Sequence, residues 1–304
     1  MRAAATSAAV ALSLALAGAA GAQTYVPFTD PLPSATASTA EYQSGYNDMC
    51  REGETDTYQC VTDTIVEMDN RYAALHETCD HRGLFALSYL RTTEEYQRAS
   101  LEPGFFQDPE FVNHEDAIFA QLYFDAYDRW EAGERSPARV PRAWQVAFQA
   151  AEDRSVSTLG DVMLGISAHI NRDLPYTLAT IALNDPETGA SRKPDHDRVN
   201  KFLARVPGPL FAEIGEKWDP SYQGRDSTLP VSTLAGLPPI QLWREMAWRW
   251  AERLVEARTA SERRNVEQGI EEYAHQAALT IERATRLGPG EDTSARDAYC
   301  LANR

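Results

Sequence analysis

Apolar residues recur every three or four positions along most of the chain, as they do in helices that bury one face. The first such stretch has its apolar residues at Val61, Ile65, Met68, Tyr72 and Leu75. Similar stretches cover residues 84–98, 109–127, 155–182, 195–206, 240–258 and 261–287, and Gly or Pro lies between most of them. Alternating apolar and polar positions are few. The pattern therefore predicts an all-α protein, a single-domain bundle of about eight helices over residues 41–304.

The first 22 residues have the three parts of a secretory signal peptide. Arg2 gives the positive start, residues 10–20 are apolar, and Ala20-Gly21-Ala22 fits a cleavage site before Gln23. The apolar run is short for a membrane span, and a retained anchor is the alternative. Residues 23–40 are rich in Pro, Ser, Thr and Ala and predict a flexible segment. We therefore expect a secreted or periplasmic protein with no stable membrane insertion after the signal is removed.

Acidic residues dominate the charge of the chain. The 45 Asp and Glu residues outnumber the 29 Lys and Arg residues and give a formal net charge of −16. A field of this sign repels nucleic acid and anionic membrane surfaces, so the charge predicts no nucleic-acid partner and favours a small-molecule substrate or ligand. The oligomeric state does not follow from the sequence.

The chain has four cysteines: Cys50, Cys60, Cys79 and Cys300. An even number in an exported chain predicts two disulfides, for which three connectivities exist. We favour Cys50–Cys60, which closes a short polar loop, and Cys79–Cys300, which would tie the C-terminal tail to the first helices. A cysteine metal site is the alternative, but the sequence has no C-x-x-C pair.

The stretch Ala168-His-Ile-Asn-Arg-Asp-Leu-Pro175 places polar side chains inside an apolar helical run. His169 and Asp173 are four residues apart and therefore lie on one face of a helix, where they could bind one metal ion or pair with each other. Pro175 lacks an N–H group, so the helix should kink or restart near Asp173. In the alternative, Asp173 caps a new helix with Pro175 in its first turn, and His169 is a hydrogen-bonded core residue.

Two further groups of side chains suit metal or proton chemistry. His196 stands between Asp195 and Asp197, and Asn200 follows on the same predicted helix. Neighbouring residues on a helix point apart, so only one or two of the three can face one site, and Asp195 is also placed to act as an N-cap. His81 is a candidate proton carrier because imidazole titrates near pH 6.5, with a loop residue as the alternative.

Several motifs resemble an uncharacterised bacterial family that is known only as a domain of unknown function. They are Ser167-Ala-His-Ile-Asn-Arg-Asp-Leu-Pro-Tyr-Thr-Leu178, Asp195-x-Asp-Arg-Val-Asn200, Leu87-x-Tyr-Leu-Arg-Thr-Thr-Glu94 and Gly104-Phe-Phe-x-Asp108. The resemblance covers roughly residues 71–286 and implies no established activity. The position of His196 need not be histidine in that family. The resemblance therefore favours Asp195, Asp197 and Asn200 over His196 as site residues of this segment.

A more distant similarity links the His169-x-x-x-Asp173 pair to the zinc-dependent phospholipase C and P1-type nuclease enzymes. Those are secreted all-α proteins that bind zinc through such a pair on a helix, so the similarity implies zinc as the metal. The chain departs from their pattern because it has six histidines in all and its predicted mature start is Gln23, whereas those enzymes need more histidines and begin with a ligating Trp. The similarity is therefore limited to one motif.

The sequence leaves two functions open. The first is a metal-dependent hydrolase acting on a small or neutral substrate, in which a divalent ion activates water. Zinc is the favoured ion. The predicted metal ligands are His169, Asp173, Asp195, His196 and Asp197. The predicted catalytic residues, which would orient groups or carry protons, are His81, Asn171 and Asn200. The alternative is a non-catalytic ligand-binding protein, in which the His, Asn and Asp side chains form a structural network and residues 219–239 frame an apolar groove.

Overall fold

The computed structural model describes residue 50, residues 56–223 and residues 237–304. The predicted signal peptide, the predicted flexible segment 23–40 and most of the stretch 219–239 lie outside the described residues. At the ends of that stretch, Pro220–Tyr222 form a short 3₁₀ turn, η2, and a helix begins at Leu237.

The described part of the chain is helical, as the apolar periodicity predicts, with two isolated β-bridges and no strand. The helices of the first half are α2 (Thr57–Thr78), α3 (Arg82–Ser100), α4 (Pro109–Glu131), α5 (Arg142–Glu152), α6 (Thr158–Ala168) and α7 (Leu174–Ile181). Between α6 and α7 lies a π-helical turn, η1 (His169–Asp173). The second half contains α8 (Lys193–Leu203), α9 (Pro207–Lys217), α11 (Leu237–Glu256), α12 (Ala260–Thr285) and α13 (Ser294–Asn303).

With α6, η1 and α7 taken as one continuous helix, the described residues form ten helices, not the expected eight or so. One helix that the periodicity did not predict is α13, which has ten residues and only Cys300 fully buried. A short helix with so narrow a buried face leaves little apolar pattern in the sequence.

Local signals in the sequence account for where several helices begin. The Asp56 carboxylate accepts hydrogen bonds from the backbone N–H groups of Tyr58 and Gln59 at the start of α2. Asp108 caps α4 in the same way, with Pro109 in the first turn, where its missing N–H costs nothing. Thr259 and Glu262 form a capping box at the start of α12.

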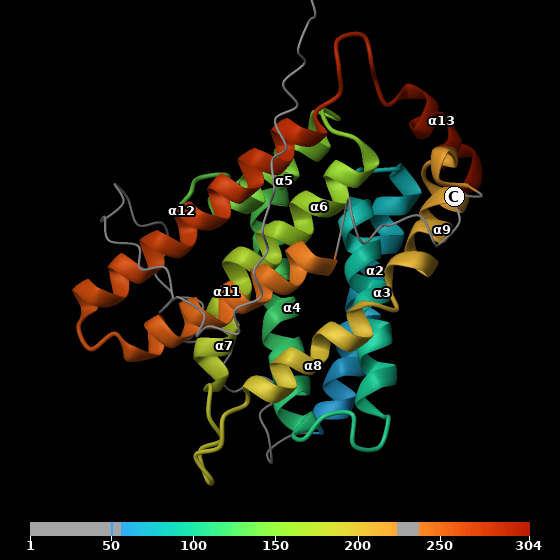
Figure 1. Ribbon diagram of the computed structural model, residues 1–304. Helices are drawn as coiled ribbons and strands as arrows, with labels where there is room; N and C mark the ends of the chain where they lie inside the picture. Colours follow the sequence, from blue (N-terminus) through green and yellow to red (C-terminus); the bar gives the residue numbers. More distant parts are fainter. Residues whose placement is uncertain (1–49, 51–55, 224–236) are drawn as a thin grey trace, which may run out of the picture.

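The α6–η1–α7 helix runs through the middle of the molecule (Figure 1). It contacts α3, α4, α5, α11 and α12, and Figure 1 shows α12 lying along α5 and α6 while α2, α3 and α4 run together on the other side. All five residues of η1 are buried. A polar stretch is therefore held at the centre of the bundle, where an unpaired polar group is costly.

Both predicted disulfides are confirmed, Cys50–Cys60 and Cys79–Cys300. The second joins the end of α2 to α13, which packs against α9 and α2. Two disulfides fit a protein of an oxidising, extracytoplasmic compartment. A search of the described helices finds none that combines the length and the apolar character needed to cross a bilayer.

Candidate active site

The helix changes from α to π geometry at His169, six residues before Pro175. Pro175 has no N–H to give to the carbonyl of Asn171, and the N–H of Leu174 reaches back five residues to the His169 carbonyl. Helix α7 then restarts with Pro175 in its first turn. The expected interruption near Asp173 is confirmed, although the Asp173 side chain makes no capping hydrogen bond to α7.

The side chain of Asp173 instead holds His169. The Nδ1 atom of His169 lies 3.0 Å from Asp173 Oδ2, and both side chains are buried. Trp144 Nε1 donates to the same oxygen at 2.9 Å, and Arg172 Nη1 donates to Oδ1 at 3.2 Å. Since Asp173 accepts hydrogen bonds from these donors, Nδ1 of His169 carries a proton and donates it to the carboxylate.

Burial lowers the pKa of His169, and its hydrogen bond to Asp173 opposes that effect only in part. The ring is therefore neutral near pH 7, with its proton on Nδ1 and a lone pair on Nε2. The ring stacks on Phe119 at a centroid distance of 3.4 Å, and Tyr89 meets it edge-on at 4.5 Å. These contacts fix the direction of the lone pair.

His169 lines a cavity of about 120 Å³ between α3, α4, η1, α8 and α11. The Nε2 atom is buried and has no hydrogen-bond partner among the described residues. Other polar atoms of the lining are also buried and lack a partner there: Glu115 Oε2, Asp116 Oδ2, Tyr89 OH, Thr93 Oγ1 and Arg244 Nε. Native proteins leave few such atoms unpaired, so their concentration around one cavity indicates a ligand or ordered water.

Two adjacent carboxyl groups of α4 face this environment. Burial, with repulsion from Asp195, raises the pKa of Glu115 to about 7, although Arg244 opposes the shift. Burial and the neighbouring Glu115 raise the pKa of Asp116 to about 8. At pH 7 the pair of carboxyl groups therefore retains a proton, and Asp116 holds it in preference to Glu115 because its pKa is higher.

Arg244 of α11 supplies the positive charge at the cavity, and His196 positions it. Arg244 Nη2 donates to the backbone carbonyl of His196 at 2.7 Å and lies 3.2 Å from its Nδ1. Burial and the charge of Arg244 lower the pKa of His196 well below its usual value. His196 is thus a neutral acceptor, and its Nδ1 stands 3.9 Å from Glu115 Oε1.

The remaining residues of the predicted site lie away from the cavity lining. Both oxygens of Asp195 accept backbone N–H groups of Gln107 and Asp108, so this carboxylate holds the turn before α4. Asp197 is exposed and pairs with Lys193. Asn171 donates to Ser167 Oγ within the central helix at 3.0 Å. Asn200 is partly buried on α8.

The structure therefore does not bring the five predicted metal ligands together. His169 and Asp173 bond to each other, Asp195 binds backbone, His196 faces Arg244, and Asp197 faces solvent. Across residues 56–223 and 237–304, no cluster of three or more His, Cys, Asp or Glu side chains could hold a metal ion.

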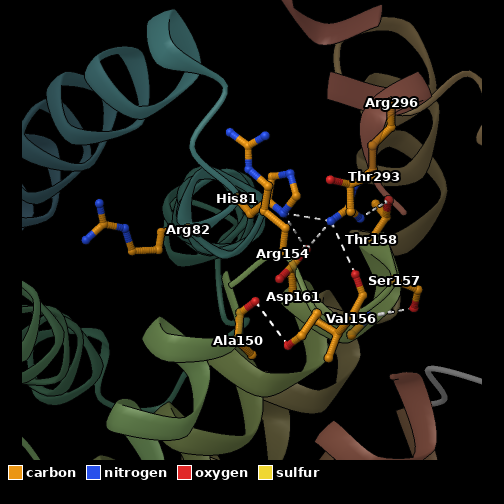
Figure 2. Close-up of polar contacts among 12 residues, drawn as sticks. His81, Arg82, Ala150, Arg154, Val156, Ser157, Thr158, Asp161, Thr293 and Arg296 are labelled. Atoms are coloured by element: carbon orange, nitrogen blue, oxygen red, sulfur yellow. Dashed lines mark hydrogen bonds and ion pairs between the residues drawn. The ribbon is translucent and has the colours of Figure 1, made fainter. Parts of the chain in front are cut away.

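His81 lies at a different place, in the polar cluster that Figure 2 shows. Arg296 Nη2 donates to His81 Nδ1 at 2.7 Å and to Asp161 Oδ2 at 2.9 Å. His81 Nε2 lies 2.7 Å from Asp297 Oδ1, and burial together with Arg296 lowers the pKa of His81 to about 4. Arg296 and Asp297 belong to α13, so His81 fastens the C-terminal helix and is absent from the cavity lining.

Glu115, Asp116 and Arg244 were not predicted. A signal for the two acids was present, since Glu115 and Asp116 interrupt the apolar face of α4 between Val112 and Phe119, at positions where a purely structural helix would bury apolar side chains. Arg244 carried no such signal, because only the packing of α11 against α7, η1 and α8 brings it to the cavity.

The fold and the site define an all-α protein whose central π turn places His169, held by Asp173, at the wall of a cavity. A family model described as "Family of unknown function (DUF5995)" matches residues 61–284, and the chain belongs to this family. No curated protein and no solved structure matches the chain. The similarity to the zinc-dependent phospholipases and P1-type nucleases therefore still rests on the spacing of His169 and Asp173.

Proposed function

We propose that this protein is a hydrolase that cleaves a small neutral acyl compound, such as an ester, by general acid–base catalysis in the His169 cavity. The supporting observation is the cluster of buried polar atoms without described partners around that cavity, with the Nε2 lone pair of a neutral, fixed imidazole among them. A cavity of about 120 Å³ accepts a small group, somewhat smaller than the benzene that a cavity of about 150 Å³ binds.

In this reaction His169 Nε2 takes a proton from water, and the water oxygen forms a bond to the carbonyl carbon of the substrate. Asp173 stabilises the imidazolium that results, as its hydrogen bond to Nδ1 permits. Arg244 offers positive charge to the developing oxyanion. The bond from carbon to the leaving oxygen breaks, and protonated Asp116 gives that oxygen its proton, so the products are a carboxylic acid and an alcohol. His169 then releases its extra proton to water and Asp116 takes one up, which restores the starting state.

Kinetics with a panel of p-nitrophenyl esters test this proposal. His169→Gln should lower kcat by at least about 100-fold while the protein stays folded, because general-base catalysis contributes factors of about 10² to 10⁴. His275→Gln is the matched control, since His275 is a partly buried histidine on α12 that does not line the cavity. Equal rates for the two variants would contradict the proposal.

Zinc remains a separate proposal, and the acid–base route does not require it. Elemental analysis of the purified protein, with activity measured before and after dialysis against a chelator, tests it directly. One equivalent of zinc whose removal abolishes activity would support the metal-dependent form, and full activity in metal-free protein would reject it.

A non-catalytic ligand-binding protein is the second candidate, and the many apolar and aromatic side chains of the cavity lining favour it. In that case neutral ligands would bind, no ester of the panel would be turned over, and His169→Gln would change affinity without changing any rate.

A further inference from the structure

A second cavity adjoins the His169 cavity, and it extends the site away from the ionisable groups. It has a volume of about 60 Å³ and lies between α3, α6, α9 and the start of α11. The two cavities share a wall formed by Ser88, Thr92, Ile166, Leu203 and Ile240. Leu203, Ile166 and Ile240 are only partly buried, and a rotation of these side chains would join the two volumes.

The chemical character of the second cavity differs sharply from that of the first. Every residue that lines it alone is apolar, namely Val162, Met163, Val206, Pro207, Leu210 and Phe211. None of the ionisable groups of the first cavity reaches it. Thr92 Oγ1 in the shared wall donates to the Ser88 carbonyl at 2.7 Å, so its hydroxyl hydrogen is already used in a hydrogen bond within α3. An apolar cavity of this kind favours a hydrocarbon group, because a water molecule inside it would find few hydrogen-bond partners.

We propose that the substrate carries an unbranched aliphatic acyl chain, with its carbonyl beside His169 and Asp116 and its methyl end in the second cavity. This inference rests on the proposed function and names the substrate class of the same site. A benzene-sized cavity of about 150 Å³ corresponds to about 25 Å³ per carbon, so the two volumes together accept a chain of about six carbons beside its carbonyl oxygen.

Chain-length kinetics with p-nitrophenyl esters from acetate to dodecanoate test the inference. Each methylene that enters the cavities should raise kcat/KM about fourfold, up to about six carbons, after which kcat/KM should level off or fall. A profile without such a break, or one that rises steadily to dodecanoate, would overturn the inference.

Two substitutions should move the break in opposite directions. Met163→Trp fills the second cavity and should shift the break to shorter chains, by about two carbons. Phe211→Ala enlarges the cavity and should shift it to longer chains. Ile281→Trp is the control, because Ile281 packs on the same core cluster without lining either cavity and should leave the break in place. Identical profiles for Met163→Trp, Phe211→Ala and the unchanged protein would reject the assignment.

Calorimetric binding of 1-alkanols from butanol to decanol to the His169→Gln variant separates this inference from the proposed function. Affinity should rise about fourfold per methylene to about six carbons, and Met163→Trp introduced into this variant should move that limit. If this pattern holds while no ester is cleaved by the unchanged protein, the hydrolase proposal fails and the chain-binding cavity stands. If esters are cleaved and alkanol affinity is independent of length, the chain assignment fails and the hydrolase stands.

Discussion

Trp144 and His169 bond to the same carboxylate oxygen of Asp173, at 2.9 Å and 3.0 Å. The indole of α5 thereby limits where that oxygen can lie, and the oxygen in turn fixes the imidazole. The second oxygen of Asp173 faces Arg172, whose Nε donates to Glu271 of α12 at 2.8 Å. The candidate base is therefore oriented by a buried chain of polar groups that crosses three helices.

Asp173→Asn should impair both stability and activity. An amide places an NH₂ group either against Arg172, where it opposes one buried donor, or against the indole and imidazole, where it opposes two. We expect the free energy of unfolding to fall by about 2 kcal/mol, since Arg172 keeps its pairing with Glu271, and kcat to fall with it. Urea denaturation and ester kinetics measure the two effects.

Asp128→Asn is the control for that substitution. Asp128 is an exposed residue of α4 that pairs with Arg71 of α2. Loss of a surface ion pair should change the free energy of unfolding by less than about 1 kcal/mol. An equal loss of unfolding free energy in both variants would show that the buried hydrogen bonds of Asp173 stabilise the protein no more than a surface ion pair does.

Asp116→Asn should make the protein more stable at alkaline pH. The pKa of Asp116 is about 8 in the folded protein and near 3.9 in an unfolded chain. The folded state thus holds a proton that the unfolded state releases, and stability falls as pH rises from about 4 to 8. We expect the variant to match the unchanged protein in Tm at pH 4 and to exceed it by about 3 °C or more at pH 8, as measured by calorimetry.

The rate of hydrolysis should depend on pH in the form of a bell. Activity rises as His169 loses its proton, at a pH below 6.5 because burial lowers its pKa, and falls near pH 8 as Asp116 loses its own. Asp116→Asn should remove the alkaline limb while the acidic limb remains. If the alkaline limb survives in this variant, Asp116 is not the acid.

His81 should govern acid stability and leave catalysis untouched. Its pKa of about 4 in the folded protein lies below the value of an unfolded histidine. The unfolded chain takes up a proton at His81 at a higher pH than the folded protein does. The contribution of neutral His81 to the free energy of unfolding is therefore complete above about pH 6.5 and is lost as pH falls toward 4. His81→Gln should flatten the fall of Tm between pH 6.5 and 4, with kcat unchanged at pH 7. A large loss of kcat would instead return His81 to its predicted role as a proton carrier.

The two disulfides should differ in their contribution to stability. Cys79–Cys300 spans 221 residues and Cys50–Cys60 spans 10. Loop-closure entropy then predicts losses of about 5 kcal/mol and about 3 kcal/mol when each pair is replaced by Ser. Denaturation curves of the two double variants measure the difference, and a larger loss from the Cys50–Cys60 pair would contradict the entropic account.

The sequence predicted the features that depend on neighbours along the chain. Apolar periodicity located most helices, and Pro175 indicated the interruption at Asp173. Reasoning from chain neighbours did not predict α13, whose single fully buried residue leaves a weak pattern. It also missed Arg244, which reaches the site only because α11 packs against α7, η1 and α8. It also grouped His169 with residues 195–197, although their side chains serve different contacts in the folded protein.

The Cys79–Cys300 bond also has a consequence for proteolysis. It makes nearly the whole helical part of the chain a covalent ring, so a single cut anywhere between residues 80 and 299 leaves one molecule of unchanged mass apart from the added water. The two fragments would separate on a denaturing gel only after reduction. A chain nicked once by a protease can thus keep all of its helices in one covalently connected molecule.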